Sequence, residues 1–367
     1  MSKTITPRQF AALVACYIQG SLLSMMYYYQ RSGHDAWLML IMGGVLFLPL
    51  IFLYCRMLGI SRGEGLSGML SHSFGKIAGK VVLLAYLIYF IYLAAFSLRQ
   101  SAQFINIDIL VEVPIWIPIV LMGLVCWYGS SKGVSFFAFT APILCVGIYI
   151  LLLFLTAFLF PRIQPRFLFP VFDRTWGDSI IPILLPFTMP FGELVCMTVF
   201  MGRVRMPERV GKYPLWKSFL TGFILGFFFV LVVLLRDILV LGPFASILSY
   251  PAYEVIRFAS IGSVITRIES VFNLPFLFIL FFRISIQLWC SIELMREIFP
   301  KAAGKKLCLL TTLLVAASAY IFASSNVAML NKAITWIPLF FLIPQVAIPV
   351  CMLIGGLIRK RRYDTLT

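Results

Sequence analysis

Charged residues and histidine are scarce in this chain. Only 12% of its 367 residues are charged, and only two are histidine, His34 and His72, whereas about a quarter of the residues of an ordinary soluble domain carry a charge. Two histidines argue against a histidine-based metal cluster and against a Ser/His/Asp triad. The sequence also has no GxxxxGK[ST] phosphate loop, which argues against an ATP-driven pump. We therefore expect no metal, no cofactor and no ordinary enzyme activity.

The spacing of the cysteines shows no close pairs. The eight cysteines lie singly along the chain, and none forms a CxxC motif. Disulfide frameworks and zinc sites depend on closely spaced or paired cysteines. The sequence therefore predicts that these cysteines serve as small apolar packing residues.

Long apolar stretches make up most of the chain, of which 61% is hydrophobic and 16% aromatic. A helix needs about 20 apolar residues to cross the hydrocarbon core of a bilayer, and no stretch shows the alternation of a barrel strand. The sequence predicts an all-α integral membrane protein that forms one domain over residues 1–367. The ten predicted spans are 10–29, 36–55, 81–98, 113–129, 134–160, 179–202, 218–235, 270–292, 307–330 and 333–358.

The formal net charge of +16 is distributed unevenly. Most Lys and Arg residues lie in alternate loops and at the two ends of the chain, so the positive-inside rule places both termini in the cytoplasm. Basic residues in so apolar a chain indicate loops that face anionic lipid, not a nucleic-acid partner. The stretch 236–269 is predicted to be an outer loop of short helices, either a lid over the outer mouth or a passive interfacial segment.

Two ionisable residues lie near the middle of predicted spans, Glu193 in the sixth and Arg283 in the eighth. A charge at that depth costs about 2.5–3.5 kcal/mol, so such residues usually face a partner or a water-filled cavity. Two interpretations stay open and are compatible with each other. The residues form a mutual ion pair that fixes helix packing, or they form a polar centre that binds ligand or carries a proton.

The sixth span also contains helix-breaking residues, Pro182, Pro186, Pro190 and Gly192. Their pattern predicts unwinding over residues 185–192, and Gln19-Gly20-Ser21 is a weaker break in the first span. Interrupted helices at equivalent positions of two five-helix halves, about 10–160 and 179–358, favour an inverted-repeat transporter fold with its site at the breaks. The alternative is a proline kink used only for packing.

Other polar and aromatic side chains extend this candidate site. Tyr89 and Leu93 share a helical face with Tyr86 in the third span, as a pocket wall or as ordinary core, and Gln287 lies one turn after Arg283. The complete predicted ligand-binding set is Gln19, Gly20, Ser21, Tyr89, Leu93, Thr188, Phe191, Gly192, Glu193, Arg283 and Gln287.

Five short motifs, in this order and spacing, resemble the B subunit of GerA-type spore germinant receptors, a branch of the spore germination permeases within the amino acid-polyamine-organocation superfamily. The motifs are Thr6-Pro7-Arg8-Gln9, Asp35-Ala36-Trp37, Leu98-Arg99-Gln100, Pro190-Phe191-Gly192-Glu193 and Arg267-Ile268-Glu269. The resemblance implies a LeuT-like 5+5 inverted repeat with broken helices 1 and 6. It also implies the spore inner membrane, with both termini on the core side, A and C subunits as partners, and a small nutrient germinant such as an amino acid.

Three functions are compatible with this sequence. The first is a receptor subunit that binds germinant at mid-membrane and signals to its partners. The second is a proton-coupled amino acid transporter in which Glu193 carries the proton. The third is a structural subunit whose pocket is vestigial. The first and second need the same pocket, so the sequence alone does not separate them.

Overall fold

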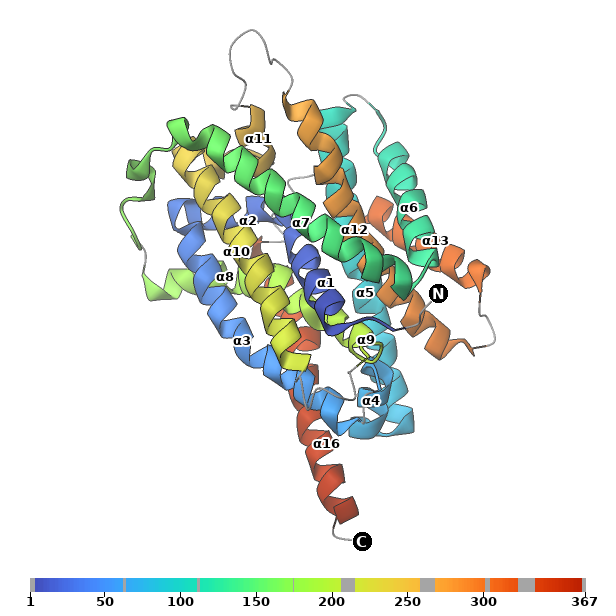
Figure 1. The fold of residues 1–367 in the computed structure, drawn as a ribbon. Coiled ribbons are helices and arrows are strands. Elements are labelled where there is room, and N and C mark those ends of the chain that lie inside the picture. The colour runs from blue at the N-terminus through green and yellow to red at the C-terminus, as the bar shows by residue number, and fades with distance from the viewer. Residues whose placement is uncertain are drawn as a thin grey trace.

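The computed structural model describes residues 4–61, 64–110, 113–173, 175–205, 215–257, 268–300, 304–322 and 334–364. Within these ranges the chain is helical, apart from connecting turns and one isolated parallel bridge between Ile5 and Val204. Figure 1 shows the helices gathered in one bundle, with α16 and the C-terminus extending from one end. The α-helices are α1 (Pro7–Gln19), α2 (Met25–Ser32), α3 (Ala36–Ile60), α4 (Leu66–Phe74), α5 (Lys76–Phe104), α6 (Trp116–Ser131), α7 (Val134–Leu159), α8 (Trp176–Pro186), α9 (Met197–Met201), α10 (Leu215–Leu241), α11 (Pro251–Arg257), α12 (Ile268–Ile298), α13 (Lys305–Ile321), α15 (Ile337–Leu342) and α16 (Ile348–Asp364).

Seven helical segments of the described chain are long and apolar enough to cross a membrane. They are Pro7–Ile60, Lys76–Ile109, Val134–Arg162, Trp176–Met201, Leu215–Ser246, Asn273–Ile298 and Ile337–Arg359. Pro7–Ile60 contains both of the first two predicted spans, and α6 is a shorter apolar helix. The protein is therefore an integral membrane protein. The predicted count of ten crossings fits this arrangement and stays a prediction.

Helix α1 begins with a capping box. The Thr6 backbone N–H donates to Gln9 Oε1 at 2.9 Å, and the Gln9 backbone N–H donates to Thr6 Oγ1 at 3.3 Å. Pro7 occupies the first helical turn, where its missing N–H costs no hydrogen bond. The Thr6-Pro7-Arg8-Gln9 motif thus encodes a helix start.

The predicted break in the first span is confirmed. Helix α1 ends at Gln19, and a short 3₁₀ turn, Leu22–Ser24, connects it to α2. The Ser21 backbone N–H bonds the Ile18 carbonyl, and the Ser21 hydroxyl donates to the same oxygen at 2.6 Å. A Cβ on Gly20 would lie 2.7 Å from the Cβ of Arg283. Glycine is therefore needed here because the break lies directly against α12.

The predicted break in the sixth span is also confirmed, with different limits. Helix α8 continues through Leu185 and Pro186, and the irregular part extends beyond Gly192 to Cys196. Within it, Phe187–Phe191 forms a wide π turn in which Met189 is extended, at φ −130° and ψ 108°. Pro186 has no N–H to donate and its ring crowds the carbonyl of residue i−4, and α8 ends at this residue. Pro190 lacks the donor that a continuing helix needs.

The helices pack in two groups around these breaks. In one group α10 packs against α1 and α3, and α3 packs against α8; in the other, α12 packs against α5, α6 and α13. Helix α1 also contacts α7 and α12, and so joins the two groups (Figure 1). The broken first and sixth segments therefore face α12 in the interior of the protein.

One prediction about the outer loop is wrong. The sequence places Arg236 and Asp237 at the start of the outer loop, but α10 runs to Leu241 and both side chains are buried. Arg236 Nη2 lies 2.7 Å from Asp237 Oδ1, and the Tyr29 hydroxyl donates to Asp237 Oδ2 at 2.9 Å. The two charges neutralise each other, so both can be buried inside the protein.

The short helices expected in stretch 236–269 are present where the structure describes them. Residues Gly242–Ser246 form a 3₁₀ turn, and α11 covers Pro251–Arg257. Residues 258–267, the linker before α12, lie outside the described ranges, as do 323–330 of the predicted ninth span.

Gly222 permits the close approach of α10 to α1, which suggests a test. A Cβ at Gly222 would lie 2.3 Å from the Ala11 carbonyl oxygen, whereas a Cβ at Gly59, in α3, would meet no described atom within 4 Å. We expect Gly222→Ala to lower the free energy of unfolding by about 1–3 kcal/mol. Gly59→Ala, the matched control, should leave it unchanged or raise it by up to about 1 kcal/mol. Equal thermal shifts in detergent for the two variants would contradict this packing.

Candidate functional site

A buried polar cluster joins the first, sixth and eighth spans. Glu193 lies in the 3₁₀ turn Gly192–Cys196, and its Oε2 atom accepts hydrogen bonds from three side chains. Arg283 Nη2 is at 2.5 Å, the Tyr17 hydroxyl at 2.9 Å and Gln287 Nε2 at 3.3 Å. Glu193 and Arg283 are only 2% and 4% exposed. The predicted ion pair is thus present, and it is accompanied by two polar neighbours.

The break in the first span supplies a further acceptor to Arg283. In a continuous helix the Tyr17 carbonyl would accept the N–H of residue 21. The Ser21 N–H instead bonds the Ile18 carbonyl, so the Tyr17 carbonyl oxygen accepts Arg283 Nη1 at 3.0 Å. The guanidinium carbon also lies 4.6 Å from the centroid of the Tyr17 ring, within cation–π range. Arg283 is therefore held by a side chain, a freed carbonyl and a ring face.

A second polar cluster contacts the sixth-span break at Thr188 and Gly192. Gln345 lies in the π turn Ile343–Ala347 between α15 and α16. Its Nε2 donates to the Tyr89 hydroxyl at 2.7 Å and to the Thr188 carbonyl oxygen at 3.0 Å. The N–H of Gly192 bonds the Phe187 carbonyl, so the Thr188 oxygen is left for Gln345. A side chain of the last span therefore satisfies the break in the sixth.

Most predicted site residues lie in or beside these two clusters. Glu193, Arg283 and Gln287 form the first, with Gly20 packed against Arg283. Tyr89 and Thr188 contact Gln345, and a Cβ on Gly192 would overlap the Gln345 amide.

Four predicted residues lie elsewhere. Gln19 Nε2 donates to Cys145 Sγ at 3.9 Å, and the Ser21 hydroxyl donates to the Ile18 carbonyl oxygen in the last turn of α1. Leu93 is buried in the apolar core. Phe191 packs against the rings of three phenylalanines, Phe47, Phe223 and Phe227. The ligand role assigned to these four residues, like that of the other seven, stays a prediction.

Sequence reasoning missed Tyr17 and Gln345. Tyr17 lies in the last turn before the first break, where an aromatic residue looks like ordinary core. Gln345 is an uncharged polar residue that follows Pro344 within an apolar run. A search for polar residues beside proline, and not only for charges, would have found Gln345.

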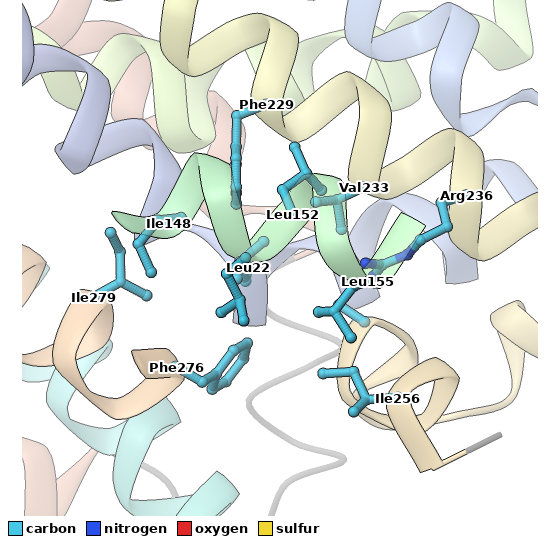
Figure 2. A pocket seen from close by; sticks show the side chains of 12 residues that line it. Leu22, Ile148, Leu152, Leu155, Phe229, Val233, Arg236, Ile256, Phe276 and Ile279 are labelled. Atoms are coloured by element: carbon cyan, nitrogen blue, oxygen red, sulfur yellow. The ribbon is translucent and has the colours of Figure 1, made fainter. Parts of the chain in front are cut away.

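An apolar cavity of about 40 Å³ lies near the first-span break. Figure 2 shows its lining, contributed by the 3₁₀ turn after α1 and by α7, α10, α11 and α12. Leu22 and Ile279 line it close to Gly20, and Arg236 is the one charged residue among the described residues that line it. The cavity thus offers apolar contact, whereas the charged chemistry lies at Glu193 and Arg283.

Removal of one member of the ion pair should be costly. Glu193→Gln leaves Arg283 as a buried uncompensated charge, and we expect a loss of about 3–5 kcal/mol in the free energy of unfolding. The double variant Glu193→Gln/Arg283→Met should recover most of that loss, because no charge remains unpaired.

The exposed pair Glu254–Arg257 provides the control. Its Arg257 side chain is 57% exposed, so Arg257→Gln should change stability by less than about 1 kcal/mol. Denaturant unfolding in one detergent would measure all three variants. A double variant less stable than Glu193→Gln would show that the pair is not coupled as the geometry indicates.

The fold is that of a LeuT-like membrane transporter. The chain is similar to Mhp1, a nucleobase-cation-symport-1 family transporter, in a closed conformation with bromovinylhydantoin bound, at TM-score 0.63 and 12% identity, covering 97% of this chain and 91% of Mhp1. The inward facing conformation of Mhp1 gives TM-score 0.53 and 13% identity, covering 98% and 78%. At such low identity the likeness shows the fold alone.

The family follows from the sequence match. A family model described as spore germination protein matches residues 4–327, and the chain belongs to this spore germination permease family. Spore germination protein XB of Bacillus anthracis is 24% identical over 289 residues, 78% of each chain. Spore germination protein KB of Bacillus subtilis is 22% identical over 369 residues, 98% of this chain and 96% of the relative. The predicted family is therefore confirmed, and the protein is a germination-related membrane permease.

Proposed function

We propose that this protein is the nutrient-sensing membrane subunit of a spore germinant receptor and binds a zwitterionic amino acid at mid-membrane. The observation that supports this is the buried Glu193–Arg283 pair, held at 2.5 Å between the broken sixth span and α12. The proposal includes the spore inner membrane, termini on the core side, and A and C subunits as partners. The names of the germination proteins to which the chain is similar support it.

Charge balance favours a zwitterion over an uncharged solute. An uncharged ligand between Glu193 and Arg283 would separate two buried charges and pair neither, at a cost of several kcal/mol. An amino acid replaces one ion pair by two, because its ammonium group pairs with Glu193 and its carboxylate with Arg283. Buried charge therefore stays neutralised in both the free and the bound state.

Such an exchange requires movement. At 2.5 Å, Glu193 and Arg283 leave no space for a ligand between them, so binding separates the 3₁₀ turn of the sixth span from α12. The separation also releases the Arg283 bond to the Tyr17 carbonyl, which joins α12 to the first span. A ligand shifts such an equilibrium by its differential affinity for the two states. The helix displacement is the signal that we propose reaches the partner subunits.

A proton-coupled amino acid transporter is the second candidate. The buried carboxylate of Glu193, in a fold shared with the transporter Mhp1, supports it. In that case protonation of Glu193 would release Arg283 and open the same site. A transporter releases its ligand on the opposite side of the membrane, whereas a receptor subunit does not.

Reconstitution of the full chain in liposomes distinguishes the candidates. For a receptor subunit we expect saturable binding of a radiolabelled amino acid pool, no counterflow, and at least tenfold weaker binding in Glu193→Gln because a charge-assisted hydrogen bond is lost. Counterflow would identify a transporter instead. Glu254→Gln, which changes a carboxylate outside the cluster, is the control for net charge.

Spores provide the second readout. We expect spores with the double variant Glu193→Gln/Arg283→Met, in which no buried charge is left unpaired, to need at least tenfold more nutrient for germination, at unchanged abundance of the protein and its partners. An unchanged dose response would exclude this site, and a loss of abundance alone would favour the structural-subunit alternative.

A further inference from the structure

Two buried glutamine amides flank consecutive residues of the broken sixth span. Gln287, from α12, donates its Nε2 to Glu193 Oε2 at 3.3 Å. Gln345, from the last span, has its Oε1 atom 2.0 Å from the position that a Cβ on Gly192 would occupy. Both glutamines are 0% exposed. The amides thus approach residues 192 and 193 from α12 and from the last span.

Hydrogen bonds fix the orientation of each amide. The Thr188 carbonyl oxygen accepts from Gln345 at 3.0 Å, and a carbonyl can only accept, so the NH₂ group of Gln345 must face it. The ionised Glu193 carboxylate likewise only accepts, so the NH₂ group of Gln287 faces Glu193. Rotation of either amide by 180° would bring two acceptor oxygens together. The positions of both Oε1 atoms are therefore determined by the fold.

Both of these carbonyl oxygens lack a donor. Within the described residues, Gln287 Oε1 and Gln345 Oε1 are buried and accept no hydrogen bond. Buried polar atoms of native proteins are nearly always satisfied, so each exception needs an explanation. The Gln287 amide bonds the Glu193 carboxylate, and Gln345 Oε1 lies against Gly192, the preceding residue. Two orphan acceptors beside consecutive residues, one of which carries a carboxylate, call for a ligand that brings several donors and positive charge.

We propose that Gln345 and Gln287 recognise the ammonium group of the germinant, and that they make the site specific for primary ammonium compounds. This inference rests on the proposed function. A primary ammonium group has three N–H donors, which match the two amide oxygens and the Glu193 carboxylate. An N-trimethylated compound keeps the positive charge but brings no donor, so it leaves both oxygens unsatisfied.

Gly192 is part of the same arrangement. Any side chain at this position would meet the Gln345 amide, whose Oε1 and Cδ atoms lie 2.0 and 2.4 Å from the Cβ position. Gly192→Ala should therefore displace the amide and weaken binding, while the Glu193–Arg283 pair remains. Gly192 thus leaves room for the Gln345 oxygen, and the next residue, Glu193, supplies the charged acceptor.

Competition binding with the full chain in lipid nanodiscs tests the inference. The probe is a radiolabelled pool of amino acids, competed by the unlabelled amino acids or by their N-trimethyl derivatives. In the wild type we expect the amino acids to compete at least tenfold better than the trimethyl compounds. In Gln345→Leu and in Gln287→Leu that ratio should fall toward one. Each variant loses an amide oxygen that accepts from a primary ammonium group but not from a trimethylammonium group.

Tyr54→Phe is the matched control. It removes the hydroxyl that donates to the Gln345 backbone carbonyl oxygen at 2.7 Å but leaves the side-chain amide and its bond to the Thr188 carbonyl oxygen, so the competition ratio should stay near the wild-type value. Thermal midpoints of all variants separate loss of recognition from loss of folding. Gly192→Ala should also lower the ratio, because its Cβ displaces the Gln345 amide although neither glutamine is substituted.

Three other outcomes would each contradict a specific claim. If the variants bind the pool and keep the wild-type ratio, the two oxygens do not recognise the ammonium group, while the proposed function stands. If replacement of sodium by potassium weakens wild-type binding and the Gln345→Leu variant loses that dependence, the oxygens hold a metal cation instead. If the wild-type protein binds no amino acid, the proposed function itself fails.

Discussion

The ion pair between Glu193 and Arg283 is the interaction on which the centre of this protein depends. Neither charge is tolerated alone at that depth, because the membrane interior offers no solvent to replace a lost partner. The pair joins the broken sixth span to α12, and Arg283 also bonds the first span through the Tyr17 carbonyl. Three spans are therefore held by one guanidinium group. A ligand that engages this group acts on all three at once.

The two breaks are stable because side chains satisfy the backbone groups that they free. Arg283 donates to the Tyr17 carbonyl, Gln345 to the Thr188 carbonyl, and the Tyr28 hydroxyl to the Met189 carbonyl. Such satisfaction within the protein is required in a membrane, where unpaired backbone groups cost several kcal/mol each. The same requirement makes each break a potential binding site, since a ligand that offers equivalent groups can substitute for the side chains. A fold that binds a solute at such breaks can therefore also detect one.

A second buried ion pair, Arg236–Asp237, stabilises a different region. It lies within α10 and is joined to α2 by the Tyr29 hydroxyl. Arg236 also lines the apolar cavity next to the 3₁₀ turn of the first span. The segment that follows the first break is therefore tied to α10 on one side, while the break itself contacts α12 on the other. Residues 20–29 therefore connect α12 to α10.

The sequence by itself determined the membrane class, the all-α character, the two breaks and the mid-span positions of Glu193 and Arg283. These features depend on local chemistry: apolar runs long enough to span a bilayer, proline and glycine within them, and charges at mid-span. Only the tertiary structure decided which groups meet. Tyr17 and Gln345 join the site because distant spans pack there, Phe191 turns into an aromatic cluster, and Asp237 is buried beside Arg236. Those outcomes depend on the directions of side chains on helices far apart in sequence, and local sequence patterns do not encode those directions.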